Sequence, residues 1–189
     1  MIPDSFAQLG LPRRPYLAEE AVRDAFHLLA AERHPDKTGG ESGPFAELTA
    51  AFEIVRNPVT RLKHLIDLEG LVAAATAPSV PEDLMELFPA VAQTCRQLAA
   101  ATEKHRAAPN ALARSLAAAD FAPARRDAQQ LNARLDDLYR ASLDELRRID
   151  ADWPDPASGR ALPALHSRLA YLTRWREQLR EFLLQLQLT

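Results

Sequence analysis

The sequence predicts an all-α protein in two parts, a helical hairpin followed by a bundle of three or four helices. Apolar residues recur at intervals of three and four through most of the 189 residues, which is the period of helices that bury one face. Proline and glycine, which interrupt regular structure, gather in a few short segments between these stripes. One such segment, residues 71–81, carries no charge and is bracketed by helix-breaking residues, so we place the division between the two parts there.

The first long helix of the hairpin is predicted to end near Arg33. Its apolar residues stand at i, i+3, i+4 and i+7, and they are Val22, Ala25, Phe26 and Leu29. Pro35 has no amide hydrogen to donate and disfavours the helical conformation for His34, so the helix should stop just before these two residues. Arg23 and His27 fall on the solvent side of the same helix.

A loop and a second long helix are predicted next. Residues 38–44 are rich in glycine and oppose regular structure. A helix resumes at Phe45, and its apolar face is made of Leu48, Ala51, Phe52 and Val55. It should end near Asn57, because Pro58 disfavours a helical residue before it. The His-Pro-Asp tripeptide at 34–36 therefore lies in a loop between two helices.

Two helices joined by a loop with His-Pro-Asp closely resemble a J-domain. Other positions agree with that family: residues 6–11 match its short first helix, Lys37 follows the tripeptide, and residues 45–61 match its third helix. The resemblance implies an antiparallel hairpin with a short first helix over residues 1–70. It also implies a partner, a DnaK-type 70-kDa heat-shock chaperone, whose ATP hydrolysis the loop would stimulate. The chain would then be a regulator and not an enzyme.

The resemblance assigns the contact with the chaperone to the loop and to basic residues beside it. Asp36 supplies charge-assisted hydrogen-bond acceptors, Pro35 restricts the loop, and His34 supplies a hydrogen-bonding ring. The complete predicted chaperone-binding set is His34, Pro35, Asp36, Lys37, Arg23, His27 and Arg33. A simpler interpretation is a helix-ending turn in which Asp36 caps local amides.

The basic face of this helix is thin. Its two arginines stand among four acids, Glu19, Glu20, Asp24 and Glu32. Leu28 and Glu32 also occupy positions where many J-domains have lysine or arginine. Because basic residues favour encounter with the acidic docking surface of the chaperone, we expect a weak or partner-specific contact.

The segment after the hairpin narrows the resemblance to the HscB family, the co-chaperones of iron–sulfur cluster assembly. Residues 57–70 look like the end of the HscB J-domain, residues 83–86 look like the start of its C-terminal domain, and residues 169–172 and 179–183 look like its last helix. The resemblance implies that residues 82–189 form a client-binding domain. Its client would be an iron–sulfur scaffold protein.

Off-stripe apolar residues are the candidates for the client surface. By helical geometry and by the resemblance, they are Leu84, Met85, Phe88 and Tyr171. Trp175 and Phe182 share the face of Tyr171 and are expected to pack against a third bundle helix or against the J-domain. Where the family places acids after the apolar cluster, this chain has Pro89 and Ala92, so the identity of the client stays open.

Helical stripes also organise the second part. A short helix is predicted over about residues 110–119, followed by a long helix that begins near Pro123. Residues 153–159 are too rich in proline and glycine to continue it and should form the turn into the last helix. Leucines at a spacing of three and four along that last helix complete a small antiparallel bundle.

Composition excludes several other classes of function. A formal net charge of -3 gives no support to nucleic-acid binding. The one cysteine, Cys95, falls on an apolar stripe and is expected to be buried, and the isolated His64, His105 and His166 are expected at the surface or at an interface. No apolar run approaches the roughly 20 residues that cross a bilayer. We therefore expect no metal, no cofactor, no membrane partner and a cytoplasmic location.

Two alternatives to an HscB-like co-chaperone stay open. One is a J-domain protein that delivers another client. The other is a helical adaptor that no longer stimulates a chaperone. The intact tripeptide argues against the adaptor, whereas the thin basic face and the missing client-side acids favour it.

Overall fold

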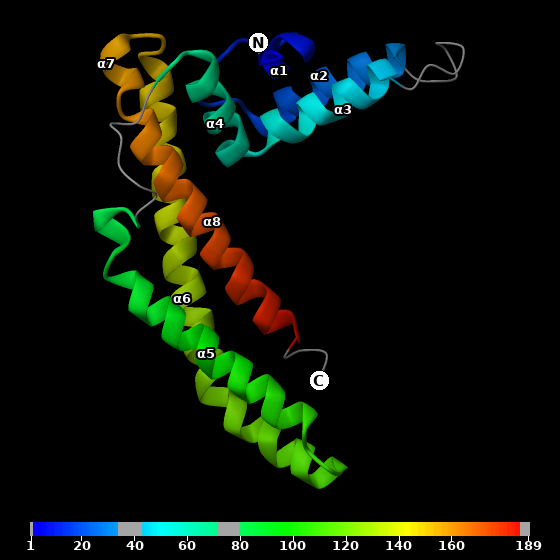
Figure 1. Ribbon diagram of the computed structural model, residues 1–189, viewed down its shortest axis with the longest axis vertical. Coiled ribbons are helices and arrows are strands. Elements are labelled where there is room, and N and C mark those ends of the chain that lie inside the picture. Colours follow the sequence, from blue (N-terminus) through cyan, green and yellow to red (C-terminus); the bar gives the residue numbers. More distant parts are fainter. Residues whose placement is uncertain (1, 34–42, 72–79, 186–189) are drawn as a thin grey trace. The chain divides into compact units, whose positions relative to one another are not determined.

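The computed structural model describes residues 2–33, 43–71 and 80–185, and it confirms the predicted all-α fold (Figure 1). Within those ranges the secondary structure is helical. The helices are α1 (Ser5–Gln8), α2 (Glu19–Glu32), α3 (Gly43–Arg56), α4 (Pro58–Leu68), the 3-10 turn η1 (Glu82–Leu84), α5 (Leu87–Arg106), α6 (Ala111–Ala151), α7 (Pro156–Gly159) and α8 (Leu162–Gln185).

The chain forms two compact units, and each is built from two separate stretches of sequence. Unit 1 contains Met1–Ala77 and Leu143–His166, and unit 2 contains Pro78–Ser142 and Ser167–Thr189. Helices α6 and α8 therefore contribute residues to both units. The predicted domain limits at 1–70, 71–81 and 82–189 stay a prediction, and residues 72–79 of the predicted connector lie outside the described residues.

The hairpin of unit 1 is formed by α2 and α3, which lie side by side (Figure 1). Val22 of α2 and Leu48 of α3 are buried. The rings of Phe26 and Phe52 stack across the pair with centroids 4.3 Å apart. Every residue of the two predicted apolar stripes is buried or half-buried.

Helix α4 follows α3 directly, after a break at one residue. The Asn57 side chain accepts a hydrogen bond from the Val59 amide at 2.9 Å, and Pro58 occupies the first turn, where its missing amide hydrogen costs nothing. Arg61 is buried beneath, and its guanidinium donates to the carbonyl oxygens of Pro15 at 3.1 Å and Val55 at 3.0 Å. Because these bonds satisfy buried carbonyls, they fix the start of α4 against the rest of unit 1.

Residues from the end of α6 complete unit 1. The Arg14 guanidinium donates to the Asp150 carbonyl at 2.8 Å, and the Tyr16 amide donates to the Asp150 carboxylate at 3.1 Å. The Trp153 indole donates to the Arg13 carbonyl at 2.8 Å. These bonds join the segment before α2 to residues more than 130 positions later in the sequence.

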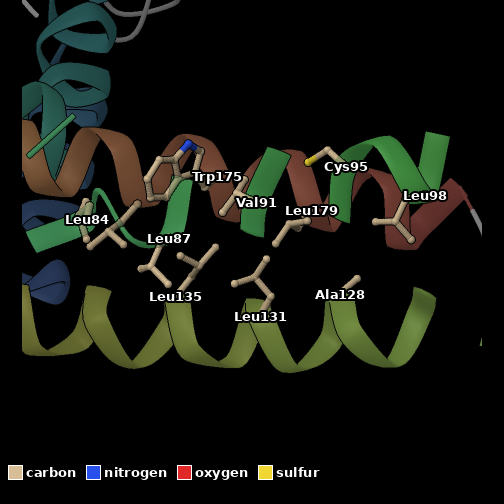
Figure 2. Packing of buried hydrophobic residues seen from close by; sticks show 11 residues of the cluster. Leu84, Leu87, Val91, Cys95, Leu98, Ala128, Leu131, Leu135, Trp175 and Leu179 are labelled. Atoms are coloured by element: carbon tan, nitrogen blue, oxygen red, sulfur yellow. The ribbon is translucent and has the colours of Figure 1, made fainter. Parts of the chain in front are cut away.

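Unit 2 is a bundle of three long helix segments. Figure 2 shows Ala128, Leu131 and Leu135 rising from α6 toward side chains of α5 and α8. The buried members of this core, several from each helix and one from η1, are Leu84, Leu87, Val91, Cys95, Leu98, Ala128, Leu131, Leu135, Leu172, Trp175 and Leu179. The predicted burial of Cys95 and Trp175 is confirmed, and Phe182 packs against the cluster as a half-buried residue.

The predicted break before Pro123 is wrong, because α6 runs without interruption from Ala111 to Ala151. The Asn110 side chain accepts a hydrogen bond from the Ala113 amide at 2.8 Å and starts the helix. An internal proline costs a helix roughly 3 kcal/mol, and the alanine-rich sequence on both sides of Pro123 supplies the highest helix propensity to set against it. The predicted turn at 153–159 is confirmed, as it holds only the four-residue α7.

In the described ranges, none of the helices has both the length and the apolar character needed to cross a bilayer.

Candidate functional site

The first candidate surface is the solvent-facing side of α2, which we call the α2 outer face. Its exposed side chains are Glu19, Glu20, Arg23, Asp24, His27, Leu28, Ala31 and Glu32. Arg23 and His27 are exposed as predicted, whereas Arg33 at the end of the helix is only half-buried. The predicted loop residues His34, Pro35, Asp36 and Lys37 lie outside the described residues.

Acids outnumber bases on the α2 outer face. It carries Glu19, Glu20, Asp24 and Glu32, with Arg23 as its only exposed arginine or lysine among the residues just named. Leu28 is 66% exposed and is the large apolar side chain of this face. The burial of Val22 on the opposite side of the helix fixes which side chains point outward. The face is therefore acidic and carries one large exposed apolar side chain.

The second candidate surface is an aromatic groove in unit 2, between α5 and α8. It has a volume of about 340 Å³. Its lining residues come from both helices and from the segment before η1, and they are Val80, Phe88, Val91, Ala92, Cys95, Tyr171, Arg174, Trp175 and Gln178. Every residue of the aromatic groove belongs to unit 2.

Three aromatic rings shape this groove. Trp175 is only 5% exposed and lies at the base, with ring centroids 6.5 Å from Phe88 and 5.7 Å from Tyr171. Phe88 is 51% exposed, so its ring stands at the rim. Tilted rings at these separations attract one another, which holds the groove open in one shape.

Cys95 lies on the wall of the aromatic groove and keeps its thiol protonated. Burial raises the pKa of the Cys95 thiol, and the thiolate is the reactive form of cysteine. The groove is therefore suited to binding rather than to nucleophilic chemistry.

The structure separates the four predicted client-binding residues. Phe88 and Tyr171 line the aromatic groove together. Met85 is exposed but does not line it, and Leu84 is completely buried in the core of unit 2 (Figure 2). Trp175 also lines the groove, although the sequence analysis expects it to pack against a third bundle helix or the J-domain. Its position four residues after Tyr171, on the same helical face, is the signal that connects the two.

Two of the three isolated histidines differ from expectation. His64 and His105 are buried, and His166 is half-buried. The Ser5 amide donates a hydrogen bond of 3.1 Å to Nε2 of His64, and the ring stacks on Phe6 with centroids 5.7 Å apart. His64 therefore has a structural role in unit 1. In the part of the chain that the structure describes, no three histidine, cysteine or acidic side chains gather as metal ligands would.

Unit 1 also holds a cavity of about 330 Å³ beside α4. Its charged lining residues are Lys63 and Asp67, which form an ion pair with each other. Burial lowers the pKa of His166, which also lines the cavity, and nearby Lys63 lowers it further. The mutual pairing of Lys63 and Asp67 leaves no charge directed at a ligand.

A helical hairpin with an exposed face on α2 and a three-helix unit with an aromatic groove define an all-α protein of two units. Among solved structures, the chain is similar to the chaperone HscB from Vibrio cholerae, with a TM-score of 0.62, 16% sequence identity, and coverage of 97% of this chain and 99% of that one. This likeness shows the fold along nearly the whole chain.

A sequence similarity to an HscB protein is also found, over a shorter part of the chain. The chain is 36% identical over 94 residues to the "Co-chaperone protein HscB homolog" of Azoarcus sp. (strain BH72), a match that covers 44% of this chain and 52% of that protein. It is 31% identical over 81 residues to "Protein psi1" of Schizosaccharomyces pombe, covering 43% of this chain and 21% of psi1. The match thus spans about half of the first relative and a fifth of the second.

No protein-family model matches the chain. The predicted resemblance to HscB is confirmed by the Azoarcus relative in sequence and by the Vibrio structure in fold.

Proposed function

We propose that this chain is a co-chaperone that stimulates ATP hydrolysis by a DnaK-type 70-kDa heat-shock chaperone and delivers a protein client to it. The observation that carries the proposal is the sequence similarity to an HscB homolog in a chain whose α2 and α3 flank a His-Pro-Asp sequence. In this proposal the chain has no reaction of its own and needs no cofactor. It acts in the cytoplasm.

The chaperone-binding part of the proposal lies in residues 1–70. His34, Pro35 and Asp36 contact the ATPase domain of the chaperone, with Lys37 beside them. The α2 outer face makes the adjoining contact through Arg23 and His27, and Arg33 extends it at the end of the helix. Because a single exposed arginine supplies little attraction, electrostatic steering contributes less to this contact than in a strongly basic helix.

The client-binding part of the proposal lies in residues 82–189, after the connector at 71–81. Phe88, Tyr171 and Met85 form the contact surface, and buried Leu84 supports the turn that presents Met85. Exposed apolar side chains that flank a groove are common in protein-binding surfaces. The proposed client is an iron–sulfur scaffold protein.

Stimulation of ATP hydrolysis tests the proposal. Steady-state hydrolysis by each DnaK-type chaperone of the source organism would be measured with the native chain, with His34→Gln and with His166→Gln. We expect the native chain and His166→Gln to stimulate one chaperone equally, and His34→Gln to leave its basal rate unchanged. His166 is a matched control because it is a half-buried histidine outside both candidate surfaces.

Failure of the native chain to stimulate any of these chaperones would contradict the proposal. It would favour the second candidate function, a helical adaptor with a J-like hairpin. The observation that favours an adaptor is the excess of acidic side chains on the α2 outer face.

If the chain stimulated a chaperone but did not bind a scaffold protein, the proposed chaperone contact would be retained. The function would then be that of a J-domain protein that delivers another client. The residues Pro89 and Ala92, which stand where the HscB family has acids, are the sequence feature on the side of that alternative.

A further inference from the structure

We infer that the client segment bound in the aromatic groove carries a carboxylate next to a bulky apolar side chain, and that Arg174 is the group that receives the carboxylate. This inference rests on the proposed function, because it takes unit 2 as the client-binding part. It adds the chemistry of the segment that the groove selects.

Helix α8 carries four arginines, and two of them have acidic partners in unit 2. Arg168 is paired with Asp83, whose carboxylate oxygen lies 2.7 Å from its Nε. Arg176 is paired with Asp136 of α6, and its guanidinium also lies over the Tyr139 ring, 4.2 Å from the centroid. These two side chains are held inside unit 2 by its own acids.

Arg174 and Arg180 are exposed, and among the described residues no acid forms an ion pair with either. Of these two arginines, Arg174 is the one that lines the aromatic groove. Glu177, three residues later on α8, is exposed and likewise forms no ion pair with Arg174 in this part of the structure. The guanidinium therefore keeps its donors available to a ligand at the groove, where its planar fork suits a carboxylate.

The groove itself has the character of a pocket for an apolar side chain. Its volume of about 340 Å³ is at the small end of the roughly 300–1,000 Å³ that binding pockets span. Among the described residues that line it, Arg174 is the only charged one and Gln178 the only amide. A segment with an apolar side chain and an acid next to it satisfies both the aromatic walls and the unpaired cation.

Occupation of the groove should strengthen the proposed ion pair. An exposed pair of charges contributes little, because water and salt screen it. An apolar side chain that fills the space beside Phe88 and Trp175 displaces water from one side of Arg174, and the attraction grows as the local dielectric falls. The apolar contact and the charge contact are therefore expected to act together.

The charge at this groove is opposite in sign to the one that the family resemblance implies. In that family, acidic residues of the co-chaperone meet the client. Here Ala92 lines the groove in place of an acid, Pro89 precedes it, and the cation is Arg174. The groove should consequently reject a segment whose apolar side chain is flanked by lysine or arginine, since like charges at close range repel.

Binding of the source organism's iron–sulfur scaffold protein to the full chain tests the inference. The dissociation constant would be measured by calorimetry for the native chain, Arg174→Gln, Arg174→Glu, Arg180→Glu and Phe88→Ser. Arg180→Glu is the matched control, because Arg180 is an exposed arginine on the same helix that does not line the groove, and both reversals change the net charge equally. Thermal unfolding would confirm that each variant is folded.

We expect Arg174→Gln to weaken binding roughly threefold to tenfold and Arg174→Glu at least tenfold, with Arg180→Glu within twofold of the native chain. Replacing the responsible acid of the scaffold with lysine should restore binding to Arg174→Glu. Equal effects of Arg174→Glu and Arg180→Glu on binding, or no effect of either, would overturn the inference. If Phe88→Ser still lost binding in that case, the proposed client surface would be retained. Absence of binding by the native chain would overturn the inference together with the scaffold as client, whatever the outcome of the ATPase experiment.

Discussion

His64 connects the first residues of unit 1 to α4 through the uncharged form of its ring. Nε2 accepts the hydrogen bond from the Ser5 amide, and a protonated ring has no acceptor to offer. Burial lowers the pKa of His64, an effect that Arg13 reinforces and that Asp4 and Asp67 oppose. The folded state therefore holds fewer protons at this site than the unfolded chain does.

This protonation difference predicts that unit 1 loses stability in mild acid. A histidine whose pKa is lower in the folded state contributes stability above its unfolded pKa of about 6.5, and that stability is lost as the pH falls toward the folded pKa. The free energy of unfolding by urea should therefore decrease between pH 7.5 and pH 5.5, and His64→Gln should reduce that decrease. At pH 7.5 the variant should cost about 1–2 kcal/mol, since the Ser5 bond is disturbed.

His166 requires a separate control, because burial lowers its pKa in the same direction. His166→Gln should remove its own share of the pH dependence and leave the share of His64 intact. An unchanged pH dependence in His64→Gln would contradict the structural role given to that histidine.

At the level of residues, the sequence predicts which side chains are buried better than it predicts which charged side chains form ion pairs. Cys95 and Trp175 follow from helical spacing, because the period of the stripe decides which side faces the core. The isolation of Arg174 does not follow from the sequence. Arg168 and Arg176 acquire their acids from η1 and from α6, far away in the chain, so only the packed bundle distinguishes these two arginines from Arg174 and Arg180.

Helix α2 carries a prediction about salt. If the α2 outer face bound its chaperone mainly by positive charge, affinity would decrease steeply as salt screened the contact. This face is acidic and carries exposed Leu28, so we expect the chain concentration for half-maximal ATPase stimulation to change less than threefold between 50 and 300 mM KCl, as estimated from the weak screening of apolar contacts.

Replacement of Leu28 tests directly whether its apolar side chain contributes to the contact with the chaperone. Leu28→Lys should raise the concentration for half-maximal stimulation by roughly threefold to tenfold, because an apolar contact is lost. Leu112→Lys is the matched control, since Leu112 is a 70% exposed leucine of α6 in a different part of the chain. A steep salt dependence, or tighter binding by Leu28→Lys, would show that the contact depends on positive charge after all.

Helix boundaries were predictable wherever a local signal sets them. The ends of α2 and α3 and the turn after α6 follow from proline and from capping side chains within a few residues. Pro123 is the opposite case, because the same residue type that ends α3 is accommodated inside α6. A proline ends a helix only where its cost exceeds the helix-favouring contribution of the flanking residues. In α6 that contribution comes from the whole length of the helix.

At the scale of the whole molecule, unit 1 is completed by residues far along the chain. The Asp150 and Trp153 bonds to Arg14, Tyr16 and Arg13 are all made inside unit 1. Gly159 also packs closely there, since a Cβ at that position would lie 3.4 Å from the Leu71 side chain. The sequence predicts a hairpin over residues 1–70 and gives no sign of this second stretch, because the contacts span too great a separation for any local pattern.

We therefore expect a fragment of residues 1–77 to be less stable than the same residues in the full chain. Loss of the hydrogen bonds from residues 143–166 should lower the free energy of unfolding by about 2–4 kcal/mol, at roughly 1 kcal/mol for each bond. Amide hydrogen exchange of α2 and α3 would compare the fragment with the full chain. Equal protection in the two would show that residues 1–77 are an independent domain.

The alternation of the chain between its two units also sets the order in which a newly made copy can mature. Residues 143–166 belong to unit 1, and the last stretch of unit 2 begins at Ser167. A ribosome adding about 5–20 residues per second supplies residues 143–166 of unit 1 only after the first stretch of unit 2, and the last stretch of unit 2 follows within seconds. Early synthesis of the hairpin therefore does not complete unit 1 early, and the two units receive their last stretches one after the other.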